Sequence, residues 1–224
     1  MNMEARLTRN LPTLSEAEQA ILAAKRVLLV GCGGLGGYVL EYLLRLGVGE
    51  VTVMDGDRFE ESNRNRQLLS APALLGQSKA EAAAARAKRI APEANCVALA
   101  EDLTPENAAA RVRGMDLALD ALDSVEARLL LEDACAAEGI PLVHGAVSGW
   151  GLQAAVSLPG SGLLHRLYEG QEGSGGSTLS FVPALCAAIE CAEAAKLLCG
   201  RESSLAGKLL LADLQHMGSE IVEL

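Results

Sequence analysis

The sequence has few aromatic side chains and no long apolar run. Phe, Trp and Tyr make up only 3% of its 224 residues. No stretch approaches the roughly 18 consecutive apolar residues that a membrane span needs. The first residues, MNMEARLTRNLPTLSEAEQ, lack the basic and then apolar segments of a secretory signal. We therefore expect a soluble, cytoplasmic protein with no membrane partner.

Positive charge is also scarce. Lys and Arg total 19 against 29 Asp and Glu, which gives a formal net charge of -10, and no basic cluster occurs. Proteins that bind nucleic acid through its phosphates depend on such clusters. We expect no nucleic-acid partner.

The six cysteines form no Cys-x-x-Cys pair. The closest set is Cys186, Cys191 and Cys199, whose offsets of 5 and 8 in an apparently helical stretch do not gather three sulfurs as zinc sites do. We expect no zinc, reduced thiols, and core packing for Cys186 and Cys191.

Strand and helix patterns alternate along the chain. They predict a helix from about residue 15, strands at 26–30, 50–55, 96–99, 115–120 and 140–144, and helices at 34–46, 79–90, from about 105, and at 125–138. A strand at 151–157, a helix at 183–198 and a last strand at 208–213 complete the chain. The Gly- and Ser-rich segment 173–178 is predicted to be a mobile loop.

This order predicts one domain over residues 1–224, an α/β fold with a doubly wound, mainly parallel, Rossmann-like sheet. Helices cover both faces of the sheet, and additional strands lie at the C-terminal end. Residues 1–25 form an N-terminal arm and helix, residues 26–145 form the nucleotide-binding core, and residues 146–224 hold the later strands, loop and helix.

A glycine-rich loop joins the first predicted strand to the next helix. Gly31, Gly33, Gly34 and Gly36 occur in the pattern G-x-G-G-x-G, and Asp55 ends the following strand. Small residues let the backbone approach a phosphate at the positive end of a helix, and a carboxylate at the strand end can accept from a ribose. The pattern admits NAD or FAD as readily as ATP, and it also permits tight packing alone.

The polar segment that follows is rich in cations. Residues 55–67 contain three arginines and two asparagines, and Lys79 lies downstream. Guanidinium and ammonium groups suit a triphosphate, which carries more charge than a pyrophosphate. The alternative is a solvated, charged loop.

Two carboxylates follow the strand at 115–120. Asp120 or Asp123 could hold Mg²⁺, which takes one or two protein carboxylates together with phosphate oxygens. The alternative is that Asp123 caps the next helix.

Together these motifs resemble the ThiF/MoeB/HesA family of ubiquitin-activating-type adenylyltransferases. The resemblance rests on five motifs in order: Gly31-x-Gly-Gly-Leu-Gly36, Asp55-x-Asp57, Ser62-Asn63-x-x-Arg66-Gln67, Gly76-x-x-Lys79 and Asp120-x-x-Asp123. The arm Arg6-Leu7-Thr8-Arg9 is similar to the Arg-x-x-Arg that opens the family's domain.

The resemblance implies an activity. Family members use ATP and Mg²⁺ to adenylate the C-terminal glycine of a small ubiquitin-like sulfur carrier ending in Gly-Gly, of the ThiS or MoaD type, and release pyrophosphate. The acyl-adenylate then accepts sulfur in thiamine, molybdopterin or related biosynthesis. The sequence does not identify the carrier or the pathway.

The resemblance also implies roles for particular residues. The nucleotide-binding residues are Gly31, Gly33, Gly34, Gly36, Asp55, Asp57, Asn63, Arg66 and Lys79. Within this set Asp55 holds the ribose, and Asn63, Arg66 and Lys79 contact the phosphates. Asp123 holds Mg²⁺. Arg9 reaches the phosphates of a neighbouring subunit, which implies a homodimer. The expected catalytic residues are Arg9, Arg66, Lys79 and Asp123.

The sequence departs from the family in its cysteines. Many relatives carry two zinc-binding Cys-x-x-Cys pairs, and some carry a cysteine in the loop that crosses the carrier tail, whereas residues 158–180 contain none. We therefore expect adenylation without a cysteine-linked intermediate, with sulfur from a donor protein or a small donor. We expect hydrogen bonding from His144, packing from Trp150, and carrier contacts from His165 and Tyr168.

Three other functions are compatible with the sequence. The same chemistry could activate another carboxylate, such as that of a modified tRNA. The glycine pattern alone permits an NAD- or FAD-binding oxidoreductase, although Arg66, Lys79 and Asp123 would then lack a common purpose. The third alternative is an adaptor that retains the fold without turnover.

Overall fold

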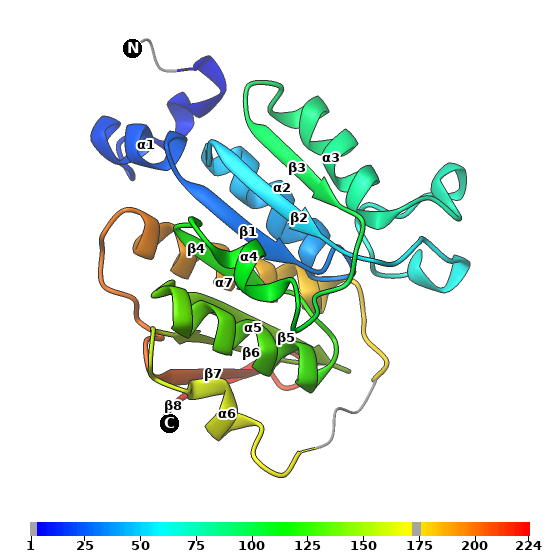
Figure 1. The fold of residues 1–224 in the computed structure, drawn as a ribbon, viewed down its shortest axis with the longest axis vertical. Coiled ribbons are helices and arrows are strands. Elements are labelled where there is room, and N and C mark those ends of the chain that lie inside the picture. Colours follow the sequence, from blue (N-terminus) through cyan, green and yellow to red (C-terminus); the bar gives the residue numbers. More distant parts are fainter. Residues whose placement is uncertain (1–3, 172–175) are drawn as a thin grey trace.

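Strands and helices alternate along the chain as the apolar pattern predicts (Figure 1). The computed structural model describes residues 4–171 and 176–224. Its strands are β1 (Arg26–Val30), β2 (Glu50–Met54), β3 (Asn95–Leu99), β4 (Leu117–Asp120), β5 (Leu142–Ser148), β6 (Gly151–Ser157), β7 (Lys208–Asp213) and β8 (Gly218–Glu223). Its α-helices are α1 (Glu16–Ala23), α2 (Gly36–Leu46), α3 (Lys79–Ile90), α4 (Ala108–Val112), α5 (Val125–Glu138), α6 (Leu163–Leu167) and α7 (Phe181–Leu198), and its 3-10 helices are Ala5–Asn10, Glu61–Asn63 and Pro72–Leu74.

The described strands form one sheet in the order β3-β2-β1-β4-β5-β6-β7-β8. Strands β1 to β5 are parallel, and β6, β7 and β8 each run antiparallel to the strand before them. The chain winds from β1 outward to β3 and then returns to β4 on the other side of β1. This reversal places a ligand crevice at the carboxyl ends of β1 and β4, and it confirms the predicted fold class.

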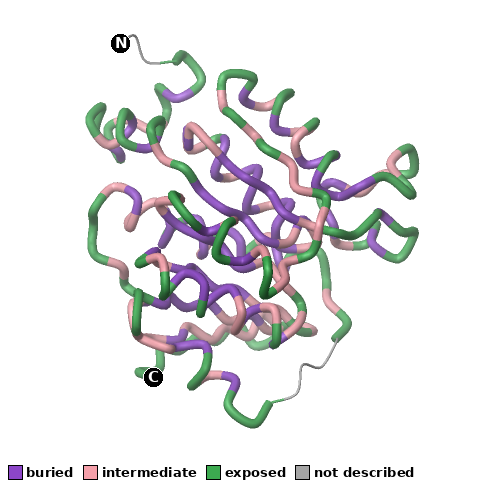
Figure 2. Tube along the Cα trace, in the orientation of Figure 1, coloured by how far each residue is buried: buried purple, intermediate pink, exposed green. Residues whose placement is uncertain are grey.

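Helices cover both faces of the sheet. Buried side chains of α2, α3 and α7 pack on one face and those of α4, α5 and α6 on the other. Successive side chains of a strand point to opposite faces of the sheet. In β4, Leu119 packs with the helices of the first face and Ala118 with those of the second. In Figure 2 the buried residues concentrate in the central strands. A parallel strand covered on both faces is apolar throughout, which explains the continuous apolar pattern of β1.

The C-terminal part differs from the prediction in two places. The strand at 208–213 does not finish the chain, because β8 follows it and pairs with β7 from Gly218 to Glu223. All six residues of β8 are exposed, so the strand carries no apolar alternation. The short helix α6 also lies where a loop was expected. Part of the predicted mobile loop, residues 173–175, lies outside the described residues.

The N-terminal arm lies along the far end of α2. The Arg6 guanidinium donates to the carbonyl of Leu44 (2.8 Å), and the Asn10 amide donates to that of Leu46 (3.3 Å). Ser15 caps the start of helix α1, because its hydroxyl accepts from the Glu18 amide (3.2 Å). The arm is therefore attached to the C-terminal end of α2, away from the glycine loop. Among the residues described, no helix is both long and apolar enough to cross a membrane.

Candidate active site

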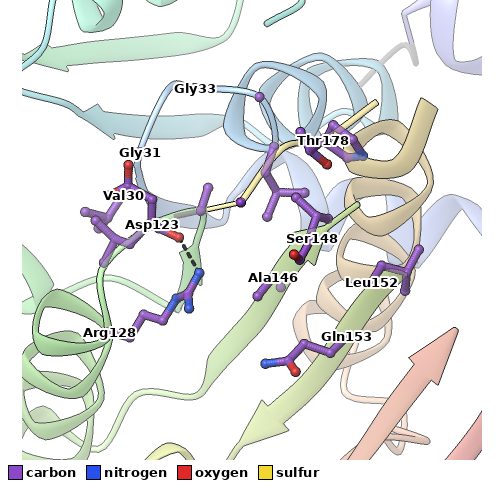
Figure 3. A pocket seen from close by; sticks show the side chains of 18 of the residues that line it. Val30, Gly31, Gly33, Asp123, Arg128, Ala146, Ser148, Leu152, Gln153 and Thr178 are labelled. Atoms are coloured by element: carbon purple, nitrogen blue, oxygen red, sulfur yellow. Dashed lines mark hydrogen bonds between the residues drawn. The ribbon is translucent and has the colours of Figure 1, made fainter. Parts of the chain in front are cut away.

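A cavity of about 1130 Å³ opens at the carboxyl ends of the parallel strands (Figure 3). Its walls come from the glycine loop after β1, the segments after β2, β3 and β4, and residues of β5 to β8. The cavity spans the crevice predicted by the reversal of strand order. It therefore has a part beside β1, β2 and β4 and a part beside β5 to β8.

The four glycines of the loop have two different roles. A Cβ built on Gly31 would lie 2.4 Å from the Ala121 carbonyl oxygen, and one on Gly36 would lie 1.8 Å from the Gly31 oxygen. Gly31 also has a φ of 97°, which favours glycine. Gly31, Gly33 and Gly34 line the cavity, whereas Gly36 does not and serves the packing of α2 on the loop.

Asp55 holds the loop in place from the end of β2. One carboxylate oxygen accepts from the Cys32 amide (2.6 Å), and the other accepts from the Asp57 amide (2.8 Å). Each oxygen retains a lone pair, because a carboxylate has about four acceptor sites. Asp55 lines the cavity, so it can bind a ribose while it orders the glycine loop.

Lys79 is paired within the site. It opens α3, its side chain is 8% exposed, and its Nζ lies 2.7 Å from the Asp57 carboxylate, which is 71% exposed. Both residues line the cavity. The buried ammonium is therefore held in position by a carboxylate that is itself exposed to solvent.

Of the two residues predicted to contact phosphates from the segment directly after β2, only one lies at the cavity. Arg66 lines the cavity, and a Cβ built on Gly34 would lie 3.5 Å from its Cγ. Asn63 is buried outside the cavity lining, where its Oδ1 accepts from the Glu60 amide (2.9 Å). Gln67 ends the motif that contains Asn63 and Arg66 but was assigned no role. It lines the cavity, and among the described residues its buried Oε1 has no partner.

Asp123 is exposed at the cavity, and no described residue pairs with its carboxylate. It does not cap α5, since the Ser124 hydroxyl accepts from the Ala127 amide (3.2 Å). Asp123 therefore fits Mg²⁺ held by one carboxylate and phosphate oxygens. In residues 4–171 and 176–224, no group of three or more His, Cys, Asp or Glu could hold a metal by itself.

Asp120 belongs to a buried hydrogen-bonded network instead. One oxygen accepts from the Leu122 amide (2.9 Å), and the other lies 2.6 Å from His144 Nδ1. The His144 Nε2 is 3.1 Å from both the Tyr168 hydroxyl and Gln153 Nε2. His144 thus forms hydrogen bonds as expected, below the cavity wall.

Arg128, Tyr168 and Gln153 bring this network to the cavity lining. Arg128 donates to the Tyr168 hydroxyl (3.0 Å) and to the Leu122 carbonyl (2.7 Å). Burial raises the pKa of Tyr168 to about 12, so its hydroxyl retains its proton. Arg128 and Gln153 stand in no recognisable motif, so the sequence predicted neither as a site residue.

Three further residues lie away from the cavity lining. Arg9 is exposed on the arm attached to the opposite end of α2. His165 is held by Asp133 on the surface (2.8 Å). Trp150 is 43% exposed and packs against Phe181, with ring centroids 5.3 Å apart.

The buried cysteines are poor nucleophiles. Burial raises the pKa of the Cys32, Cys186 and Cys191 thiols well above the ordinary value. Cys186 and Cys191 pack in the α7 core, as predicted. A thiol that stays protonated has little thiolate for attack on an acyl group.

A doubly wound sheet with this glycine loop, the carboxylate of Asp55 at the end of β2 and cations at the cavity defines a nucleotide-binding α/β protein. The ThiF family model matches residues 5–224. The chain belongs to the ThiF family, which confirms the resemblance seen in its motifs.

Curated relatives match over most of this chain. It is 35% identical over 211 residues to the SAMP-activating enzyme E1 of Haloferax volcanii, covering 91% of this chain and 78% of that protein. It is 37% identical over 216 residues to the sulfur carrier protein adenylyltransferase of Thermus thermophilus, covering 91% and 80%. The chain spans about half, 46%, of the pig adenylyltransferase and sulfurtransferase MOCS3, at 36% identity over 211 residues.

A solved structure shares the fold. E. coli MccB, crystallised with ATP, superposes with a TM-score of 0.84 at 19% identity, over 99% of this chain and 72% of that one.

Proposed function

We propose that this chain is an ATP-dependent adenylyltransferase that activates the C-terminal glycine of a small ubiquitin-like sulfur carrier. The observation that carries the proposal is that Gly33, Gly34, Asp55, Arg66, Lys79 and Asp123 all line one cavity. Membership of the ThiF family supports it, as do relatives named for SAMP activation and for adenylyl transfer to a sulfur carrier.

The reaction needs charge neutralisation more than proton transfer. The ionised glycine carboxylate attacks the α-phosphorus of ATP, a new O–P bond forms, the bond between the α- and β-phosphates breaks, and pyrophosphate leaves. Two anions meet, so Arg66 and Lys79 neutralise the phosphates. Mg²⁺ held by Asp123 would supply further positive charge at the phosphate oxygens. No protein nucleophile or general base takes part.

The cavity divides between the two substrates. Asp55, Arg66, Lys79 and Asp123 come from segments after β2 and β4, and they serve the nucleotide beside the glycine loop. The part beside β5 to β8 is left for the carrier's C-terminal residues. The reacting carboxylate and the α-phosphate then meet near the ends of β4 and β5.

Arg9 acts on the neighbouring subunit of a homodimer. Its attachment at the far end of α2 keeps it from the cavity of its own chain. In a dimer, an exposed arm residue can complete the partner's phosphate site. The buried thiols leave the sulfur to a donor protein or a small donor.

The rise in melting temperature on ligand binding tests which nucleotide the protein binds. Mg·ATP at about 100 times its Kd would add roughly 2.7 kcal/mol, a rise of about 5–11 °C in Tm for a chain of this size. NAD⁺ and FAD serve as comparisons, and Asp123→Ala should weaken the Mg·ATP effect. Stabilisation by NAD⁺ or FAD and not by Mg·ATP would favour an oxidoreductase.

A further inference from the structure

Gln153 presents a hydrogen-bond acceptor to the cavity from strand β6. Its Nε2 donates to the Tyr168 hydroxyl (2.7 Å) and lies 3.1 Å from His144 Nε2. Among the residues that the structure describes, no donor reaches its Oε1, and this atom is not among the buried ones. In Figure 3 the side chain extends toward the space that Arg128 also faces.

The network below the cavity fixes which way this amide points. His144 Nδ1 lies 2.6 Å from the Asp120 carboxylate, which matches the Nδ1–H tautomer, and in that tautomer His144 Nε2 is an acceptor. The Tyr168 oxygen accepts from Arg128 (3.0 Å) and Gln153, which leaves its own proton for His144 Nε2 (3.1 Å). A flipped Gln153 would set its oxygen against the His144 lone pair. The amide nitrogen therefore faces the network and the oxygen faces the cavity.

Gln153 also stands at the junction of the two parts of the cavity. It pairs with Ala146 across β5 and β6, and Arg128 links its partner Tyr168 to the segment after β4 that carries Asp123. The surrounding lining includes Ala146, Gly151 and Gly176, which leave room for a peptide backbone. In a peptide, the N–H nearest the reacting carboxylate is that of the terminal residue, two bonds away.

We propose that Gln153 Oε1 accepts the N–H of the last peptide bond of the acyl substrate and so positions its carboxylate for attack. This inference rests on the proposed function. Gln153 contacts the substrate, and Tyr168, His144 and Asp120 act through it as positioning residues. The site thereby selects carboxylates that end a peptide over carboxylates without a neighbouring N–H.

Replacing the terminal N–H of the substrate with oxygen tests this hydrogen bond. The probes are a synthetic peptide ending in Gly-Gly and the same peptide ending in glycolate, whose last bond is an ester. ATP–pyrophosphate exchange is measured with each probe, and kcat and KM are determined separately. The wild-type protein should prefer the amide by about tenfold in kcat/KM, because the ester leaves a desolvated acceptor unpaired.

Substituting Gln153 tests whether this residue causes the preference for the amide probe. Gln153→Leu removes the acceptor and should use both probes equally. Gln171→Leu is the matched control: this residue also lines the cavity, with its nitrogen bound to the Leu167 carbonyl (2.9 Å), and it should discriminate as the wild type does.

The outcomes separate the two proposals. Exchange with an undiminished amide preference in Gln153→Leu, or no preference in the wild-type protein, would overturn this inference and leave the proposed function standing. Mg·ATP binding without exchange on the amide peptide or on any Gly-Gly-ending carrier would overturn both.

Discussion

At the residue scale, Asp120 and Asp123 are separated by two positions but lie in opposite environments. Asp120 is fully buried, and its two oxygens form hydrogen bonds with the Leu122 amide and with His144. Asp123 is exposed at the cavity and has no partner among the described residues. Asp123 can therefore bind a metal at the cavity, whereas Asp120 is buried and lies outside the cavity lining.

Removing a charge from the phosphate site should impair adenylation and spare the fold. Asp123→Ala or Arg66→Ala is expected to lower pyrophosphate exchange by roughly 10²–10³-fold, about 3–4 kcal/mol, as for loss of one preorganised electrostatic contact. Asp133→Ala and Arg64→Ala are controls of the same charge, since each pairs at the surface. Wild-type exchange in both site variants would contradict the assignment.

Glu190 is a buried acid without a partner. It lies on α7, and a Cβ built on Gly145 would come 2.5 Å from its carboxyl carbon. In the part of the chain that is described, neither carboxyl oxygen has a hydrogen-bond partner. Burial raises the pKa of Glu190 well above 4.5, Asp120 raises it further, and Arg128 opposes this.

The raised pKa makes stability depend on pH with a defined sign. The unfolded chain loses the Glu190 proton near pH 4.5 and the folded chain keeps it, so stability is lost as pH rises from 4.5 toward the folded pKa. Glu190→Gln should remove a fall of up to about 1.4 kcal/mol per pH unit. Urea unfolding at pH 5 and pH 7 measures this, with exposed Glu202→Gln as the control. Parallel profiles for the wild type and Glu190→Gln would refute it.

At the scale of elements, the turn from β1 into α2 combines packing and ligand binding. Gly36→Ala would place a methyl group 1.8 Å from the Gly31 oxygen, whereas a Cβ on Gly33 has no neighbour closer than 3.6 Å. The same substitution at the two positions therefore separates the structural glycine from the one that faces the ligand.

We expect Gly36→Ala to reduce the free energy of unfolding by about 1–3 kcal/mol through overpacking. Gly33→Ala should leave stability within about 1 kcal/mol of wild type and weaken Mg·ATP binding, because a methyl group keeps the phosphate from the backbone. Urea unfolding and the ATP-induced shift in Tm measure the two effects. The idea fails if Gly36→Ala unfolds at the wild-type urea concentration.

Local patterns predicted the elements that are buried and periodic. The strand at 26–30 and the helices at 79–90 and 125–138 have the predicted bounds, because their apolar residues face a core. The sequence did not predict strand β8, because all of its residues are exposed. It adds an edge to the sheet through backbone hydrogen bonds, which leave no apolar signature.

The site residues also differ in whether local sequence patterns could predict them. Gly33, Asp55, Arg66 and Lys79 stand in motifs that local spacing reveals. Gln153 and Arg128 meet through Tyr168 across 15 and 40 positions of sequence, so one sequence contains no signal for their contact. The burial of Asn63 likewise depends on how the 3-10 turn at Glu61–Asn63 folds.

At the scale of the whole molecule, Arg9 provides a test of the homodimer. Arg9→Ala and Arg66→Ala should each abolish most exchange, since each removes a cation from every site. In a co-expressed mixture, half of the dimers are mixed, and one of their two sites has both cations. About a quarter of wild-type activity should return. No recovery above the separate variants would place Arg9 outside the partner's site.

The central claim is formation of an acyl-adenylate at the end of a carrier. The most direct measurement is pyrophosphate exchange with Mg·ATP and a small ubiquitin-like protein ending in Gly-Gly from the same genome. We predict exchange that requires the carrier, stops when its terminal carboxylate is amidated, and falls in Asp123→Ala. Folded protein that binds Mg·ATP yet gives no exchange with any such carrier would contradict it.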